Sequence, residues 1–176
     1  MIDEIQLKFK DKIFILIAIC GLILAFYFRV FNANDFKERE LGQGSFSKIK
    51  AEREITDETS MSLEIGRSAL QVEVAMSEEK KIAGLGNREF LMNDEGMLFI
   101  FPQKGKYAFE MRSMNFALDF IFINNDEVVE IIENVPSDFE GSIAGTKEYD
   151  KVLEVNAGWS RQNEVTVGSA IKWKIK

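Results

Sequence analysis

An uninterrupted apolar run near the N-terminus most constrains how this chain can fold. Residues 13–28 read IFILIAICGLILAFYF, sixteen uncharged residues between Lys12 and Arg29. A helix of this length is about 24 Å long, and it reaches about 28 Å if Arg29 snorkels and the helix continues through Phe31. The hydrocarbon core of a bilayer is about 30 Å thick. The sequence therefore predicts a single transmembrane helix over residues 13–31.

Two alternatives for this run are a buried core helix and a cleaved signal peptide. A core helix would carry a polar stripe every three to four residues, and the run has none. Cleavage requires small residues at the first and third positions before the cut, but Phe31 lies two places before Ala33. Lipoprotein processing at Cys20 would require a small residue where Ile19 stands. We therefore interpret the run as an uncleaved signal anchor.

The charges that flank the run predict its orientation. Lys8, Lys10 and Lys12 precede it, whereas acidic and basic residues are mixed after Arg29. Positive charge favours the cytoplasmic side. We expect residues 1–12 in the cytoplasm and a single-pass protein of the cytoplasmic membrane, with its C-terminal domain in the periplasm or cell exterior.

The composition excludes several classes of chemistry. The chain has no His, which removes Ser-His-Asp and Cys-His catalysis and every His-containing zinc site. The sole cysteine allows no internal disulfide. The 22 basic and 29 acidic residues give a net charge of −7, and no basic run forms a face that could contact phosphates. We expect no metal, no cofactor and no nucleic acid partner.

Residues 32–60 differ in pattern from the residues that follow them. They mix charges with Gly42 and Gly44, and we interpret them as a juxtamembrane linker that would span about 30 Å as a flexible coil. From residue 61 to residue 176 the chain contains short β-rich segments and two short helical ones. Expected strands are 70–75, 97–101, 118–123, 127–132, 152–155 and 170–175; expected helical segments start after Ser77 and at Trp159.

These patterns predict an extracytoplasmic, mainly β domain over residues 61–176. About seven strands in roughly 115 residues indicate a compact β sandwich or barrel with one or two short helices. The N-cap Ser77 and the acidic pair after it open the first helix, which Gly84 or Gly86 closes.

Several runs of this domain resemble, in the same order, the bacterial and archaeal family called domain of unknown function 192. The likeness covers about Leu70 to Trp173. The matching stretches are Gly84-Leu85 with Arg88, Gly96 to Pro102, Phe109 to Ser113, Leu118-Asp119, Val152 to Gly158 and Val167-Gly168. The resemblance implies a small, mostly β domain, often carried behind a signal peptide or membrane anchor, and it implies no established activity.

The chain departs from the family's usual residues within one of these stretches and just after it. The family usually has Trp, Lys, Asn and Pro where this chain has Glu110, Arg112, Ser113 and Ala117. The resemblance therefore implies the location of a site but no reaction.

Residues 109–119 contain the candidate site. Alternation along a strand would place Glu110 and Arg112 on one face. Asp119 opens an apolar strand, where a carboxylate must be paired, hydrogen-bonded or solvated. An ion pair of Arg112 with Asp119, joined by Glu110, would meet that need. The group is either a structural ion pair or a site for a polar or anionic ligand; the candidate ligand-binding residues are Glu110, Arg112, Asp119 and Arg88.

Three functions remain open from the sequence. The first is a membrane-tethered binding or accessory module, favoured because no His and no convincing nucleophile–base pair is present. The second is a small hydrolase-like enzyme with Asp119 or Glu110 as base and Arg112 as anion stabiliser. The third is a structural partner of another membrane protein, bound through residues 13–28. We identify no catalytic residue and expect a non-enzymatic protein.

Overall fold

The apolar runs of the second part of the chain form seven strands of one sheet. The computed structural model describes residue 46 and residues 54–175, all within the unit 42–176. The strands are β1 (Ser60–Ile65), β2 (Ser68–Ala75), β3 (Glu95–Gly105), β4 (Leu118–Asn124), β5 (Glu127–Val135), β6 (Tyr149–Asn156) and β7 (Lys172–Ile175). The mainly β fold with about seven strands is confirmed.

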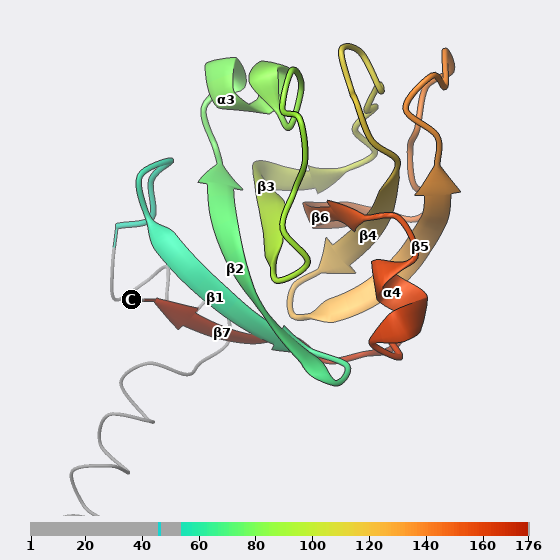
Figure 1. Cartoon of the computed structure of the whole chain (residues 1–176). Coiled ribbons are helices and arrows are strands. Elements are labelled where there is room, and N and C mark those ends of the chain that lie inside the picture. The colour runs from blue at the N-terminus through green and yellow to red at the C-terminus, as the bar shows by residue number, and fades with distance from the viewer. Residues whose placement is uncertain (1–45, 47–53, 176) are drawn as a thin grey trace, which may run out of the picture. The chain divides into compact units, whose positions relative to one another are not determined.

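The order of strands across the sheet is β5-β4-β6-β3-β2-β1-β7. Neighbouring strands are antiparallel except β2 and β3, which are parallel. The sheet curls strongly (Figure 1), and the segment before β7 meets the start of β5. There the Val128 amide donates to the Ser169 carbonyl at 3.0 Å, and the Gly168 amide donates to the Val128 carbonyl at 2.8 Å. Main-chain hydrogen bonds therefore join the two outer ends of the sheet.

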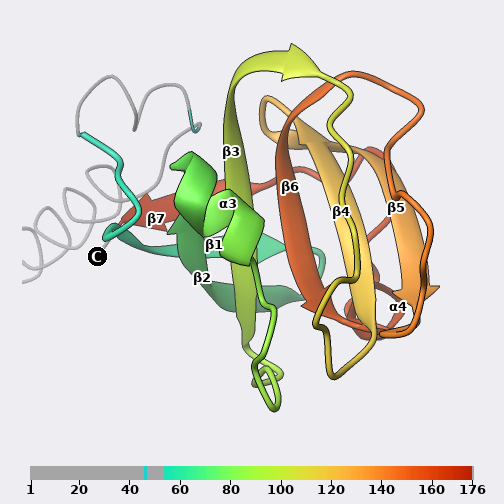
Figure 2. The same ribbon diagram turned by 90° about the horizontal axis from the view of Figure 1, so that it is seen from above.

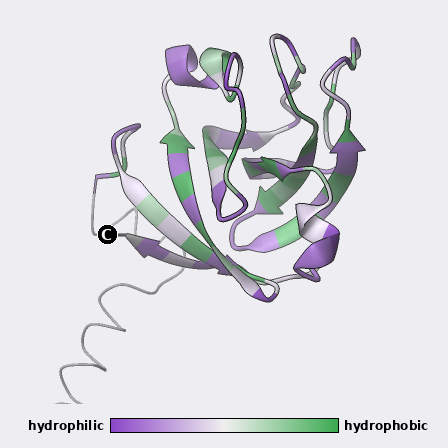
Figure 3. Cartoon of the chain, in the orientation of Figure 1, coloured by the Kyte–Doolittle hydropathy of each residue, from purple (hydrophilic) through white to green (hydrophobic). Residues whose placement is uncertain are grey.

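Both faces of the central strands are buried. One core lies inside the curl and takes apolar side chains from all seven strands, with Trp173 fully buried in it. The second core covers the outer face of β3, β4 and β6, where Phe99 and Phe120 pack beneath Leu85 and Met111. Burial on both faces explains the continuous apolar runs of β3 and β4. β2, which is exposed on one face, shows alternating hydropathy (Figure 3).

Two short helices accompany the sheet. α3 (Glu78–Ala83) begins where the Ser77 hydroxyl accepts the Lys80 amide at 3.2 Å, and it ends at Gly84, whose φ is 50°. α4 (Trp159–Gln162) follows Gly158, which adopts a left-handed conformation with φ 80°. Both expected helical segments are confirmed. Figure 2 shows α3 over the outer side of the sheet, at the opposite end from α4.

The expected cytoplasmic end, transmembrane helix and most of the linker lie outside the described residues. Among the residues that are described, no helix is long and apolar enough to cross a membrane. Within the segment interpreted as a linker, Phe46 and Ile55 are buried in the inner core, and Asp57 accepts the Met76 amide at 2.5 Å. Part of that segment therefore packs on the β domain.

Candidate ligand-binding site

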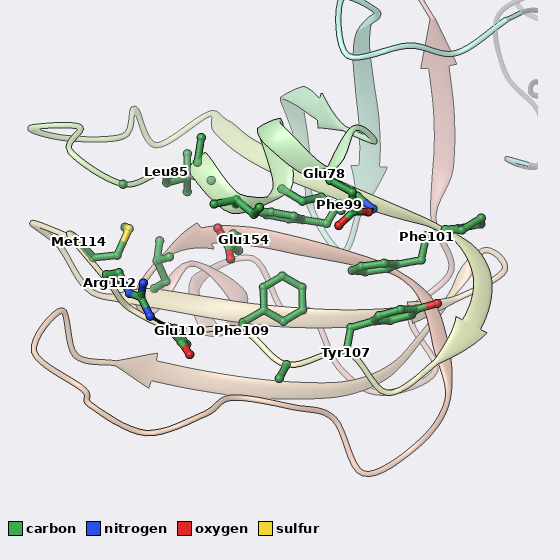
Figure 4. Close-up of a pocket in the computed structure, with 18 residues that line it drawn as sticks. Glu78, Leu85, Phe99, Phe101, Tyr107, Phe109, Glu110, Arg112, Met114 and Glu154 are labelled. Atoms are coloured by element: carbon green, nitrogen blue, oxygen red, sulfur yellow. Dashed lines mark hydrogen bonds and ion pairs between the residues drawn. The ribbon is translucent and has the colours of Figure 1, made fainter.

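A cavity of about 560 Å³ lies on the outer face of the sheet. Its floor comes from β3, β4 and β6, one wall from α3 and residues 84–86, and the other wall from residues 107–114 (Figure 4). The lining residues are Glu78, Lys81, Ile82, Ala83, Gly84, Leu85, Gly86, Phe99, Phe101, Pro102, Tyr107, Ala108, Phe109, Glu110, Arg112, Met114, Leu118 and Glu154. A cavity of this volume is within the range of small-molecule sites.

Main-chain and side-chain hydrogen bonds fix the two walls to each other at one end of the cavity. The Asn87 amide donates to the Ser113 carbonyl at 2.8 Å. The Asn115 side-chain amide donates to the Arg88 carbonyl, also at 2.8 Å. Asn87 and Ser113 both have positive φ, near 60°. These bonds hold the two loops in tight turns and keep the cavity between them.

Aromatic rings form much of the cavity wall. Phe101 and Tyr107 stack with centroids 3.7 Å apart, and Phe99 and Phe109 meet edge to face at 5.2 Å. The Tyr107 amide donates to the hydroxyl of Tyr149 at 2.8 Å, and that hydroxyl donates back to the Tyr107 carbonyl. The aromatic wall is therefore held by the sheet and has a fixed shape.

Glu154 supplies a carboxyl group to the floor of the cavity. It lies in the middle of β6, opposite Met97 of β3 and Phe120 of β4, and is 6% exposed. Figure 4 shows its side chain converging with Phe99 and Phe109 on the same space. No described residue donates a hydrogen bond or ion pair to it, and burial raises the pKa of Glu154 to about 8. Such a group is costly to bury, so it indicates a place where a ligand or water completes the hydrogen bonding.

Asp119 has a different surrounding from the one expected. It is fully buried, and its carboxylate accepts the main-chain amides of Asn134, Gly158 and Ser160 at 2.8, 3.0 and 3.0 Å. The expected ion pair with Arg112 is wrong. Three amides from the end of β5 and the start of α4 satisfy the carboxylate instead. Asp119 therefore ties elements together, and it does not line the cavity.

The other candidates from the sequence are at the rim or outside the cavity. Arg112 donates to Glu110 at 2.8 Å, with side chains 82% and 58% exposed, and both line the rim. Arg88 lies outside and binds Glu73 through both carboxylate oxygens, at 2.5 and 3.0 Å. This pair lowers the pKa of Glu73. The structure thus brings Glu110 and Arg112 together and separates them from Asp119 and Arg88.

The residues that best define the cavity were not singled out from the sequence. Glu154 stands between Leu153 and Val155 in a strand that was correctly expected. A carboxylate inside an apolar strand was the signal that drew attention to Asp119, and it applied equally to Glu154. The aromatic wall had no comparable signal, because its rings come from β3 and from a loop that follows it.

No group of three or more His, Cys, Asp or Glu side chains among the described residues is arranged to hold a metal ion.

The described part of the chain is a small, mainly β domain with a cavity on the outer face of its curled sheet. Residues 61–173 match the model of the DUF192 family, described as uncharacterised ACR, COG1430, and the chain belongs to this family. The resemblance noted from the sequence is confirmed. A search of curated proteins found no match.

Two solved structures are similar to this chain. One, from Sinorhizobium meliloti 1021, is described as a candidate transcription regulator (R01717). It is 26% identical with a TM-score of 0.62, over 68% of this chain and 96% of that one. The other is a protein of unknown function from Novosphingobium aromaticivorans DSM 12444. It is 24% identical with a TM-score of 0.59, over 64% of this chain and 82% of that one.

Proposed function

We propose that the β domain is a binding module whose site is the cavity over Glu154. The observation that carries this proposal is a buried carboxyl group at the floor of an aromatic cavity, to which no residue in the described part of the chain donates a hydrogen bond or ion pair. Ligand sites are mostly apolar and contain a few polar groups that orient the ligand. The ligand is a small molecule with an apolar body and one polar group that hydrogen-bonds to Glu154.

The hydrolase-like alternative has less support from the same geometry. It needed a desolvated and unpaired Asp119 in a cleft, whereas three main-chain amides occupy that carboxylate. It also needed Arg112 as an anion stabiliser, but Glu110 neutralises this guanidinium at the exposed rim. A binding role requires neither group.

The membrane anchor is part of the proposal and rests on the sequence. Residues 13–31 would hold the module at the outer face of the cytoplasmic membrane. Protease treatment of intact and lysed spheroplasts tests this orientation. We expect degradation of the β domain in both samples, and protection in the intact sample would contradict the orientation. Binding through the anchor to another membrane protein remains the structural alternative.

Nucleic acid is a poor candidate for the partner. The Sinorhizobium relative is described as a candidate transcription regulator. The present chain has a net charge of −7, and binding to phosphates depends on clustered positive charge. We therefore keep the small ligand as the proposed partner.

A cavity-filling variant tests the proposed function. The probe is 2-phenylethanol, added to the full chain in phosphatidylcholine nanodiscs and followed by saturation-transfer NMR, with empty nanodiscs as the blank. Ala108 is exposed and lines the cavity, so Ala108→Trp should fill it and abolish the protein-dependent signal. Ala144 is exposed and lies outside the cavity, so Ala144→Trp should retain the signal. Equal signals from the native chain and both variants would overturn the proposal.

A further inference from the structure

We propose that the ligand is an organic cation, a protonated amine on an apolar or aromatic body, whose nitrogen binds the Glu154 carboxylate. This inference rests on the proposed function and names the chemical class of the ligand. Three features of the cavity carry it: the balance of charge, the depth of the carboxyl group, and the aromatic rings around it.

The charges of the cavity lining balance except at Glu154. On α3, Lys81 donates to Glu78 at 2.6 Å. On the opposite wall, Arg112 donates to Glu110 at 2.8 Å. Since these are the other charged side chains of the lining, ionised Glu154 leaves the cavity with one net negative charge. A ligand with one positive charge neutralises the site.

The position of Glu154 argues against an anionic ligand. An ionised carboxylate only accepts hydrogen bonds, so its partner must bring N–H or O–H groups to the floor. A bound carboxylate or phosphate would need a free cation at that depth. Arg112 is 82% exposed at the rim and already bound to Glu110. An ammonium group supplies both the positive charge and the N–H donors that Glu154 lacks.

The aromatic wall is suited to the same charge. The faces of aromatic rings carry negative electrostatic potential and attract ammonium groups within about 6 Å. The protein already shows this contact at the cavity, where Lys81 Nζ lies 5.2 Å from the centroid of the Phe101 ring. Phe99 and Phe109 lie close to Glu154 in Figure 4. A ligand ammonium at Glu154 would have rings on its sides and a carboxylate beneath it.

Proton release follows from this binding mode. Burial raises the pKa of free Glu154 to about 8, so the carboxyl group is mostly protonated at pH 7 and must lose its proton to pair with an ammonium. Apparent affinity should rise about 50-fold between pH 6 and pH 8 and then level off. The titratable groups that face the cavity from the packed elements are Glu78 and Lys81 of α3 and Tyr107, Glu110 and Arg112 of the opposite wall.

Three probes with the same phenyl body test the inference. They are 2-phenylethylammonium, 2-phenylethanol and 3-phenylpropanoate, titrated calorimetrically into the full chain in phosphatidylcholine nanodiscs. We expect the ammonium to bind at least about tenfold more tightly than the alcohol, and the propanoate to show no binding. Titrations at pH 7 in phosphate and in Tris, whose ionisation enthalpies differ, should report release of about 0.9 proton for the ammonium alone.

A pair of variants assigns the effect to one carboxyl group. Glu154→Gln should reduce the affinity for the ammonium to that for the alcohol and leave the alcohol unchanged. Glu127→Gln, at an exposed carboxylate outside the cavity, should change neither. Binding of the alcohol or propanoate at least as tight as that of the ammonium, lost in Ala108→Trp, would overturn the inference and leave the proposed function standing. Binding of no probe would overturn both.

Discussion

Two carboxyl groups buried in strands show how surroundings decide the role of a residue. Asp119 of β4 accepts three main-chain amides and joins β5 and α4 to the sheet. Glu154 of β6 has no such donor among residue 46 and residues 54–175, and it faces a cavity. A satisfied buried carboxylate contributes to stability, whereas an unsatisfied one costs stability and persists where a ligand uses it.

The pH dependence of the unfolding free energy should show how much stability is lost when the buried Glu154 carboxyl group ionises. Its pKa is about 8 in the folded protein and 4.5 without burial. The folded state therefore holds this proton more tightly, and its stability falls as pH rises from about 4.5 to 8. Glu154→Gln removes this loss. The unfolding free energy of the variant, relative to that of the native chain, should therefore increase with pH, to an upper limit of about 5 kcal/mol. Urea unfolding followed by Trp159 and Trp173 fluorescence measures it, and parallel pH profiles would contradict this account.

Truncation of Asp119 should reduce stability and spare ligand binding. Asp119→Ala leaves the amides of Asn134, Gly158 and Ser160 without their acceptor. The expected loss is about 2 to 4 kcal/mol in urea unfolding. Asp138→Ala, at an exposed position, is the control. Loss of ligand binding by a variant that retains native stability would instead place Asp119 in the site.

At the scale of elements, the N-cap of α3 offers a local test. The Ser77 hydroxyl accepts the Lys80 amide at 3.2 Å, and α3 forms one wall of the cavity. Ser77→Ala should cost about 1 kcal/mol of unfolding free energy, measured by urea unfolding. Ser142→Ala, at an exposed loop position, should have no effect. Equal stability of the two variants would show that this cap contributes nothing.

The sequence predicted elements better than it predicted their neighbours. The sequence predicted β3 and β4 because strands buried on both faces have continuous apolar runs. It predicted β2 because a strand buried on one face has alternating hydropathy. Hydropathy does not show which strands pair. It therefore did not predict that β2 pairs in parallel with β3, to which α3 connects it, or that β7 pairs with β1. The cavity depends on the order of the strands, because β6 lies between β3 and β4 and brings Glu154 to the cavity floor. Residue type alone suggested Asp119 as a site residue. The main-chain amides that donate to its carboxylate cannot be predicted from a sequence pattern.

At the scale of the whole molecule, the segment before β1 is attached to the β domain. Phe46 is 6% exposed, its ring meets Trp173 edge to face at 5.2 Å, and its amide donates to Asp126 at 2.8 Å. Lys151 Nζ lies 4.5 Å from the Phe46 ring centroid, and burial lowers the pKa of Lys151. Within the linker expected over residues 32–60, Phe46 and Ile55 therefore belong to the inner core of the domain.

Removal of the Phe46 ring should loosen this attachment. Phe46→Ala should lower the unfolding free energy of the full chain by about 3 kcal/mol, because the ring is buried against Trp173. The fluorescence of Trp173 should change with it. Phe139→Ala, at a ring 41% exposed, should cost much less. A Phe46→Ala variant with native stability would show that the contact does not hold the segment.

The central claim is that Glu154 is a buried carboxyl group that no described residue pairs with and whose hydrogen bonding a ligand completes. Its most direct test is a ¹³C NMR titration of the Glu154 carboxyl carbon in the full chain, assigned by its absence in Glu154→Gln. We expect a pKa of about 8 in the free protein, falling to about 5 or below with saturating 2-phenylethylammonium. A pKa of about 4.5 in the free protein, or a raised pKa that the ligand leaves unchanged, would contradict the claim.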